Sequence, residues 1–476
     1  PTSQQYKCKN LVDKAIGYGI EGRKIDGNNI LEVFKTIESA KKRAQKGMGP
    51  TLIEAITFRM RGHEEASGIK YIPKQLFEKW KKRDPIDLFE KHLLDKKIMT
   101  SKNFSTIENE IKVKIDSAIK FAFNANLPTS SMESELKDVY KEYKSGNIEP
   151  KKDTQPLRFV DAISKGLSIA LKRDEKVILL GQDIAEYGGV FKVTEGLSQK
   201  YPDRVINTPI IESGVLGASM GLALQGYKPI VEMQFADFVT CGFNQITNNI
   251  SKNHYRWGEA VNVTIRMPSG GGIGAGPFHS QSPEAWFFHN PGMKIVYPSN
   301  AIDAKGLLLA AIDDPNPVMF FEHKALYRSI KNDVPNGYYT IPIGVGDIVQ
   351  EGQDLTIITY GQAVYWAKDV SLDYKDKGIS IEIIDLRSLV PWDKILIEES
   401  IKKTNKALVL HEANLSGGVG SEIASYISEH FFNLLDAPVV RVGSLDTPVP
   451  FSQGIEKDIY LPISRIKEKI DYLLKY

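Results

Sequence analysis

Glu212 is the residue of this sequence whose surroundings most suggest chemistry. It opens a segment of small and apolar residues from Gly214 to Ala223, and the apolar run 229–231 leads on to Gln234 and Phe238. On spacing alone, Glu212 can be read as an acidic residue in the first turn of a helix, where the helix dipole favours negative charge. It can equally be read as an isolated acid at an apolar site, a setting in which carboxylates take part in proton transfer.

A second candidate is the glycine-rich stretch from Gly270 to Gly276, which is closely followed by His279. No Gly-Lys-Ser/Thr triplet follows these glycines, so a nucleotide-binding P-loop is excluded. Their spacing also lacks the Gly-x-Gly-x-x-Gly fingerprint of dinucleotide-binding folds. A flexible surface loop is the structural alternative.

His63 follows the apolar run 51–58, which predicts a strand. Taken by itself, a histidine in such a polar stretch is most often an exposed loop residue. His411-Glu412 lacks a second histidine four residues on, so a zinc protease is excluded. Ordinary packing accounts for three further histidines that show no metal-ligand spacing, namely His254, His289 and His323.

The segment around Glu212 resembles the pyrimidine-binding part of thiamin diphosphate enzymes, and most closely the β subunit of the decarboxylating component of 2-oxo acid dehydrogenase complexes. The resemblance implies that Glu212 hydrogen-bonds the aminopyrimidine of the cofactor and assists its activation. It also implies that Gln234 and Phe238 line the same ring. Such an enzyme needs a cofactor because decarboxylation of a 2-oxo acid leaves an acyl carbanion that no side chain can stabilise.

The segment from His279 to Ala285 resembles the active-site histidine segment of the same β subunit. The resemblance implies that His279 holds the carboxylate of the 2-oxo acid and later manages protons during acyl transfer to a lipoyl group.

Residues 1–140 resemble the C-terminal half of the α subunit of the same enzymes. The matching motifs are Gly17-Tyr18-Gly19, Asp26-Gly27-Asn28, Gly49-Pro50-Thr51-Leu52-Ile53-Glu54 and Arg83-Asp84-Pro85-Ile86. This resemblance places His63 where the family has an active-site histidine, on a loop that closes over the cofactor.

The family's Gly-Asp-Gly motif, which together with a later Asn holds Mg²⁺ against the diphosphate, does not occur in this sequence. The run from Asp26 to Asn28 has the wrong spacing to replace it and matches a different part of the family pattern, so it predicts a turn. We therefore name no metal ligand in this chain and expect the Mg²⁺ ligands of the thiamin diphosphate site upstream of it.

The elements that must position these residues are short apolar strands that alternate with helices. The run 177–181 is typical of a buried parallel strand, and the apolar spacing from Ile30 to Ala44 predicts an amphipathic helix. Ser105 and Glu108 form a capping-box pattern that predicts the start of another helix. The alternation predicts an α/β fold with doubly wound parallel sheets, in which ligands bind beyond the carboxyl ends of the strands.

We expect four segments along the chain. Residues 1–140 would be the C-terminal part of an α-subunit-like diphosphate-binding domain, 141–157 a polar linker, and 158–335 a β-subunit-like pyrimidine-binding domain. Residues 340–476 resemble the α/β C-terminal domain of transketolase-type enzymes, in which we name no site residue. The chain thus resembles two subunits of the family fused into one polypeptide.

Composition excludes several other classes of function. The 476 residues carry a formal net charge of only +2, so the sequence indicates neither a nucleic-acid-binding protein nor a membrane-surface protein. Cys8 and Cys241 are the only cysteines, which excludes a disulfide framework and suits the reducing cytoplasm. No apolar run approaches the length of a membrane span.

The resemblance covers nearly the whole chain and implies oxidative decarboxylation of a 2-oxo acid, followed by transfer of the acyl group to a lipoyl group of a partner acyltransferase in a multienzyme complex. The stretches 190–197 and 391–393 resemble the branched-chain type, which acts on 3-methyl-2-oxobutanoate. Alternatives are a pyruvate or acetoin dehydrogenase component, a transketolase or another carboligase, and a non-catalytic fragment that lacks the magnesium motif. We expect a homodimer of fused chains, equivalent to α2β2.

Overall fold

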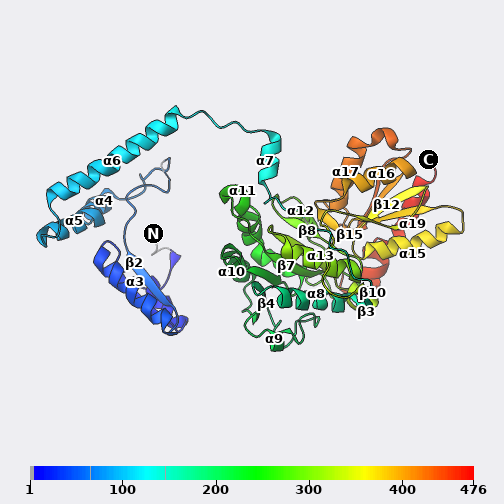
Figure 1. The fold of residues 1–476 in the computed structure, drawn as a ribbon, viewed down its shortest axis with the longest axis horizontal. Coiled ribbons are helices and arrows are strands. Elements are labelled where there is room, and N and C mark those ends of the chain that lie inside the picture. The colour runs from blue at the N-terminus through cyan, green and yellow to red at the C-terminus, as the bar shows by residue number, and fades with distance from the viewer. Residues whose placement is uncertain (1–4, 65, 145) are drawn as a thin grey trace. The chain divides into compact units, whose positions relative to one another are not determined.

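The computed structural model describes residues 5–64, 66–144 and 146–476. The chain forms two compact units, Pro1–Thr129 and Ser130–Tyr476, which are described one at a time (Figure 1). Residue 145, in the linker expected at 141–157, lies outside the described residues.

The N-terminal unit contains one β-α-β motif. Strands β1 (Glu21–Asp26) and β2 (Thr51–Ile56) pair in parallel, and α3 (Ile30–Gln45) connects them. The backbone N–H of Asn28 donates a hydrogen bond of 3.0 Å to Asp26 Oδ1, so this run forms the turn that was predicted. The unit continues with α4 (Lys74–Lys81), α5 (Pro85–Asp95) and α6 (Ser101–Asn124).

The predicted N-cap of the last of these helices, Ser105, lies five residues after the observed one. Helix α6 begins at Ser101, where Thr100 and Asn103 form the capping box. The hydroxyl of Ser105 donates instead to the carbonyl of Ser101, 3.1 Å away, inside the helix. Two capping-box patterns occur here, one at Thr100 and one at Ser105. The earlier one, at Thr100, accepts the hydrogen bond from a free N–H group at the start of the helix.

The larger unit is built on a seven-stranded sheet with the order β14-β8-β9-β7-β6-β4-β5. All its pairs are parallel except that of β14 with β8. Its strands are β4 (Val177–Gly181), β5 (Val205–Asn207), β6 (Lys228–Glu232), β7 (Thr264–Ser269), β8 (Lys294–Val296), β9 (Val318–His323) and β14 (Ser388–Val390). A separate antiparallel pair is formed by β3 (Thr154–Arg158) and β10 (Lys331–Pro335).

Helices cover both faces of this sheet, which confirms the predicted doubly wound α/β class. Val177 and Leu179 pack on the side of α8 (Phe159–Arg173) and α13 (Ala301–Asp313), whereas the alternate residue Leu180 packs on the side of α10 (Glu212–Leu224). The two-residue period of a strand therefore divides the apolar side chains between two cores.

A second sheet follows with the order β11-β13-β12-β15-β16. Its strands are β11 (Asp347–Gln350), β12 (Leu355–Thr359), β13 (Ile381–Asp385), β15 (Ala407–Asn414) and β16 (Val440–Ser444), and β11 is antiparallel to its neighbour. Helices α15 (Ala363–Lys375) and α19 (Ile463–Leu473) pack on one face of it, and α16 (Lys394–Thr404) and α17 (Val419–His430) on the other.

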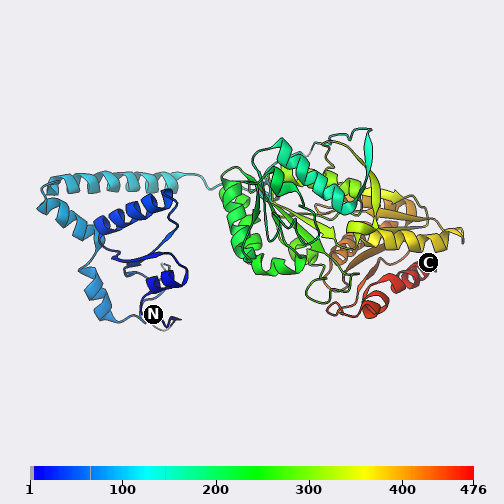
Figure 2. The ribbon, with the colours of Figure 1, turned by 90° about the horizontal axis from the view of Figure 1, so that it is seen from below.

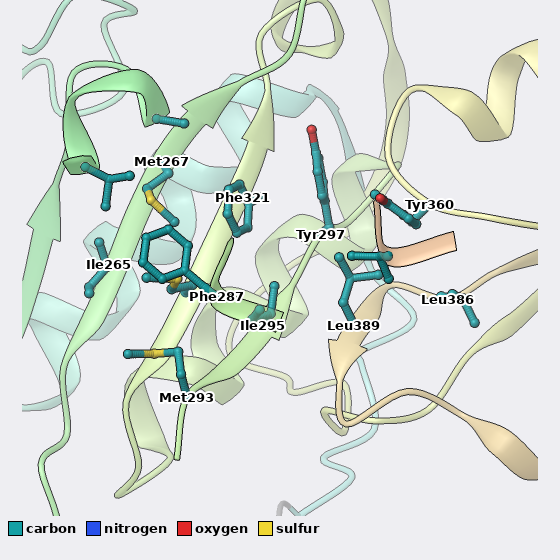
Figure 3. Packing of buried hydrophobic residues seen from close by; sticks show 14 of the residues in the cluster. Ile265, Met267, Phe287, Met293, Ile295, Tyr297, Phe321, Tyr360, Leu386 and Leu389 are labelled. Atoms are coloured by element: carbon teal, nitrogen blue, oxygen red, sulfur yellow. The ribbon is translucent and has the colours of Figure 1, made fainter. Parts of the chain in front are cut away.

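The two sheets of the larger unit share one apolar core. Tyr360, Leu386 and Leu389 from the second half of the chain lie beside Ile295 and Tyr297 from the first (Figure 3). Strand β14 belongs to the C-terminal half of the sequence but pairs with β8, at the edge of the larger sheet. The C-terminal sheet (yellow to red) accordingly adjoins the larger sheet (green) in both views of the fold (Figures 1 and 2).

Candidate active site

The candidate residues of the larger unit gather at the carboxyl edge of the seven-stranded sheet. Gln182 follows β4, Glu212 begins α10 after β5, and Gln234 follows β6. The loop that carries His279 follows β7, and Lys324 follows β9. Parallel strands bring all these segments to one edge, where ligands of doubly wound folds bind.

Glu212 is half-buried at the first position of α10 and lines a small recess. The side-chain amide of Gln182 donates a hydrogen bond of 3.1 Å to Glu212 Oε1. Val215, Val231 and Met233 supply apolar wall to the same recess. The arrangement presents one oriented carboxylate next to an apolar surface, which can hold a flat ring and exchange a proton with it.

Gln234 lines the same recess and is tied to the end of the neighbouring strand. Its Nε2 donates to Asp183 Oδ2 over 3.3 Å. Asp183 holds a left-handed backbone conformation, with φ of 57°, which turns the chain sharply after β4. The hydroxyl of Thr208, another wall residue, is buried and has no hydrogen-bond partner among the described residues. The recess therefore contains a polar atom that a ligand could satisfy.

His279 lies against two phenylalanines that follow β6. Its ring centroid is 4.8 Å from that of Phe235 and 5.6 Å from that of Phe238, both in edge-to-face geometry. Phe235 in turn contacts Phe191 at 5.5 Å. Phe238 therefore packs against His279, and Gln234 joins the Glu212 recess to these rings along the chain.

A buried ionic network stabilises the inner side of the recess. Arg266, on β7, is 1% exposed and binds both oxygens of Glu322 through Nε and Nη2, at 2.7 and 2.9 Å. Its Nη1 lies 2.5 Å from Glu232 Oε2, and Tyr327 also donates to Glu322. Burial raises the pKa of Glu232, and the positive charge of Arg266 opposes that rise. Since Glu232 lines the recess with Glu212, this network fixes its inner wall.

His63 belongs to the N-terminal unit, where its exposed side chain lies in a loop after β2. Of the histidines assigned to ordinary packing, His323 makes a specific polar contact, because its Nε2 lies 2.5 Å from Glu412 Oε2. His289 is exposed.

Two residues of the C-terminal half that sequence reasoning did not select also contact the site. Glu412 and Glu456 accept hydrogen bonds from backbone N–H groups of the glycine-rich loop before His279. The residues joined by these contacts lie 141 to 184 positions apart in the sequence. The only local feature that could have drawn attention to Glu412 is its position as an acid at the end of an apolar run. The loop is thus held by specific contacts and is not the flexible surface loop considered as an alternative.

Among the described residues, no group of three or more His, Cys, Asp or Glu side chains is placed to hold a metal ion. In the same part of the chain, no helix combines the length and the apolar character that crossing a bilayer would need.

Three protein-family models match the chain in succession. Residues 1–131 match the dehydrogenase E1 component, residues 155–330 the pyrimidine-binding domain of transketolase, and residues 344–466 the transketolase C-terminal domain.

Curated relatives match the larger part of the chain. It is 43% identical over 325 residues to 2-oxoisovalerate dehydrogenase subunit beta 2, mitochondrial, of Arabidopsis thaliana, an alignment that covers 66% of this chain and 90% of that protein. The subunit beta of 2-oxoisovalerate dehydrogenase from Bacillus subtilis is 43% identical over 307 residues, which is 63% of this chain and 93% of the relative. The mitochondrial subunit beta of Dictyostelium discoideum is 45% identical over 325 residues, with 67% and 87% covered.

A solved structure supports the fold alone. An inactive β4 tetramer of a split-gene transketolase superimposes with a TM-score of 0.55 at 24% identity, over 67% of this chain and 98% of that one.

Proposed function

This chain belongs to the E1 dehydrogenase family, with α-like and β-like parts on one polypeptide, and on that premise we propose that it decarboxylates a branched-chain 2-oxo acid and passes the acyl group to a lipoyl group of a partner acyltransferase. The observation that carries the proposal is the common location of Glu212 and His279 at one edge of the sheet. Both are half-buried: Glu212 lines the recess, and His279 packs against Phe235 and Phe238, which follow Gln234 of that recess along the chain.

The residues that line the recess suit the pyrimidine end of thiamin diphosphate by their chemistry. It combines an apolar wall with a carboxylate at Glu212, an amide at Gln234 and the unsatisfied hydroxyl of Thr208. These groups match a flat heteroaromatic ring that carries an amino group and ring nitrogens. When bound, the cofactor supplies the electron sink that decarboxylation requires.

The side chains of this site have separable tasks in the proposal. Glu212 holds or releases a proton at a carboxylate oxygen, and Gln182 orients that carboxylate through Oε1. Phe238 and Phe235 pack on His279 and keep water from one side of its ring. His279 binds the substrate carboxylate and moves protons when the acyl group leaves. His63 is the proposed contribution of the N-terminal unit.

The diphosphate end of the cofactor does not have a matching ligand set among the described residues, since no three His, Cys, Asp or Glu side chains gather there for a metal ion. We therefore assign no step to Mg²⁺. A calorimetric titration with thiamin diphosphate and Mg²⁺ tests whether this chain binds the cofactor by itself. Tight binding supports the enzyme, and absence of binding supports a non-catalytic fragment.

The branched-chain substrate is proposed because the relatives named above are 2-oxoisovalerate dehydrogenase subunits. The experiment measures CO2 release from 3-methyl-2-oxobutanoate and from pyruvate, and acetaldehyde release from acetoin, which has no carboxylate to lose, each with an artificial electron acceptor. Acylation of a lipoyl domain is then measured by mass spectrometry. We expect kcat/KM for the branched substrate to exceed that for pyruvate by about tenfold or more, the range that apolar pocket contacts provide. A preference for pyruvate or acetoin would contradict the proposed specificity. Turnover of a substrate without acylation of the lipoyl domain would favour a carboligase.

We further propose that the chain works as a homodimer in a reducing compartment such as the cytoplasm. Helix α6 exposes Ile111, Ile115 and Phe121 by 51–77%, an amount of apolar surface that another chain would usefully cover. Cys8 and Cys241 are both free thiols. Sedimentation equilibrium measures the molar mass in solution, and we expect that of a dimer. A monomer at micromolar concentration would contradict the proposed dimer.

A further inference from the structure

The segment that carries His279 is a closed loop. The backbone N–H of Gly270 donates to the carbonyl of Gln281 over 3.1 Å, which joins the two ends of the loop. Two side chains anchor this closure: Lys324 Nζ donates to the Gly270 carbonyl at 2.6 Å, and Asp237 Oδ1 accepts from the Gln281 N–H at 3.2 Å. Both side chains are buried and follow strands of the seven-stranded sheet. The base of the loop is therefore fixed by the domain from which the loop arises.

The glycine-rich arm of the loop is held by the other domain. Glu456 accepts from the N–H of Gly272 at 2.8 Å and, through its second oxygen, from the N–H of Gly274 at 3.0 Å. Glu412 accepts from the N–H of Gly271 at 2.5 Å. Three backbone N–H groups of this arm thus donate to two carboxylates, those of Glu456 and Glu412, which are 1% and 7% exposed. Hydrogen bonds between N–H groups and ionised carboxylates are about twice as strong as neutral ones.

The glycines allow this close approach. A Cβ atom on Gly271 would lie 2.6 Å from Glu456 Oε1, and one on Gly270 would lie 2.1 Å from the ring of His323. Gly270 also adopts φ of +85°, a conformation that other residues rarely take. Contact with buried side chains therefore explains Gly270 and Gly271 without any phosphate.

The carboxylate of Glu412 is part of a charged cluster that spans the two domains. Its Oε2 lies 2.5 Å from His323 Nε2, at the end of β9. Burial by itself would raise the pKa of Glu412, but His323, the Gly271 N–H and Lys324 outweigh burial and hold it below the usual range. Glu412 is consequently an anion in the folded protein and a strong acceptor for the loop.

The C-terminal sheet can act as a fixed support because it is not hinged against the larger sheet. The shared apolar core and strand β14 join the two, and Tyr360 of the C-terminal half donates to Glu284, five residues after His279, at 2.8 Å. A carboxylate on this support therefore holds the loop in a fixed position.

We propose that Glu412 and Glu456 are positioning residues for His279, which hold the glycine-rich arm so that the histidine ring stays against Phe235 and Phe238. The C-terminal domain then completes the active site without contacting substrate. This inference rests on the proposed function, in which His279 acts on the 2-oxo acid.

The first test is hydrogen–deuterium exchange of the full-length chain without cofactor, followed by mass spectrometry of peptides that cover 270–282. We expect the Glu456→Ala variant to exchange at Gly272 and Gly274 at least about tenfold faster than the wild type, because both amides lose their acceptor. The Glu456→Gln variant keeps one acceptor oxygen and should show an intermediate rate. It also serves as the test if Glu456→Ala does not fold.

The control is Glu382→Ala, which removes another buried carboxylate of the C-terminal sheet, bonded to Ser400 and Lys403 and remote from the loop. Its loop peptides should exchange as in the wild type. Equal acceleration in the control, or unchanged exchange in Glu456→Ala, would overturn the proposal.

The second test separates kcat from KM with the preferred 2-oxo acid. We expect kcat to fall about tenfold in Glu456→Ala, with partial recovery in Glu456→Gln and with cofactor affinity unchanged within about twofold. Unchanged kcat in a variant whose loop has been released would refute a role in positioning His279. A wild-type chain without activity on any 2-oxo acid would refute the proposed function instead, while the exchange experiment would still decide whether Glu456 holds the loop.

Discussion

Gln182 donates a hydrogen bond of 3.1 Å to Oε1 of Glu212, and the two residues come from different connections at the same edge of the sheet. The contact holds the carboxylate in one orientation beside the recess. It also makes two separate predictions possible, one for the acid and one for the residue that orients it.

Glu212→Gln should lower turnover by at least about 100-fold, because the amide occupies the same space but cannot exchange the proton that general acid–base catalysis requires. Thermal unfolding should change little. Proton exchange at the thiazolium carbon of added cofactor, followed by NMR, is the direct measurement. Exchange at the wild-type rate would contradict the role of Glu212. Glu175→Gln removes an exposed charge from the same domain and is the control.

Gln182→Leu should lower kcat by about tenfold, a smaller loss than that in Glu212→Gln. The leucine fills a similar volume but withdraws a hydrogen bond to a charged group, which is worth about 1.5–3 kcal/mol. Steady-state kinetics with saturating cofactor measure the effect. If kcat is unchanged, the Gln182 contact does not orient the catalytic group.

His279→Ala should leave the dissociation constant of thiamin diphosphate unchanged within about twofold and reduce turnover by about 100-fold. The reason is that His279 lies against Phe235 and Phe238 and does not line the Glu212 recess. Titration calorimetry and CO2 release provide the two readouts. His289→Ala, at an exposed position a short distance along the chain, is the matched control. Wild-type turnover in His279→Ala would remove this histidine from the site.

Arg266→Met should lower the free energy of unfolding by about 3–5 kcal/mol, because it leaves Glu232 and Glu322 buried without their counter-charge. Denaturant unfolding of the larger unit, followed by fluorescence, measures this loss in the free energy of unfolding. The triple variant Arg266→Met, Glu232→Gln, Glu322→Gln should recover part of it, since no buried charge is then left unpaired. A loss below about 1 kcal/mol in the single variant would show that the network tolerates one missing partner.

Asp385 gives a pH dependence of stability with a defined sign. Burial, reinforced by the Asp303 carboxylate, raises the pKa of Asp385 to about 7 in the folded chain, against about 4 in an unfolded one. The folded state therefore binds the proton more tightly, so this contribution is complete below about pH 4 and is lost as pH rises through 7. Between pH 5 and 8 the loss should be of the order of 2–3 kcal/mol.

The matched variant is Asp385→Asn, whose amide can bond to the Ser299 hydroxyl and the Arg387 N–H that Asp385 contacts at 2.5 and 3.0 Å. Urea unfolding at several pH values should show a flatter profile for the variant than for the wild type. Parallel profiles would exclude Asp385 as the source of the pH dependence.

Local patterns in the sequence predicted a buried strand at residues 177–181 of the larger unit. The apolar run at Val177–Gly181 is β4, because a strand buried on both faces is a short continuous apolar run. The segment after Glu212 is α10, in agreement with the reading of Glu212 as an acid in the first turn of a helix. The predicted start of α6 was wrong because two cap patterns lie five residues apart, at Thr100 and Ser105, and local sequence cannot rank them.

The contacts of Glu412 and Glu456 could not be predicted in the same way. Each reaches a glycine N–H more than 140 positions away, and the partner is a backbone group that no side-chain pattern marks. Burial of an acid is decided by tertiary packing, so His411-Glu412 reads in the sequence as an ordinary strand end. The functional roles of Glu212, Gln234, Phe238, His279 and His63 stay predictions for the experiments above.

Strand β14 has a practical consequence for anyone who dissects this protein. A gene fragment that stops near residue 340 would omit β14, so the hydrogen-bonding groups of β8 would lie open along a newly created edge. The part of the apolar core that Tyr360 and Leu389 cover would face solvent as well. Such a truncated product should self-associate through the bare strand during expression, whereas a fragment that begins near residue 150 and runs to Tyr476 keeps the partners of β8 and should remain dispersed.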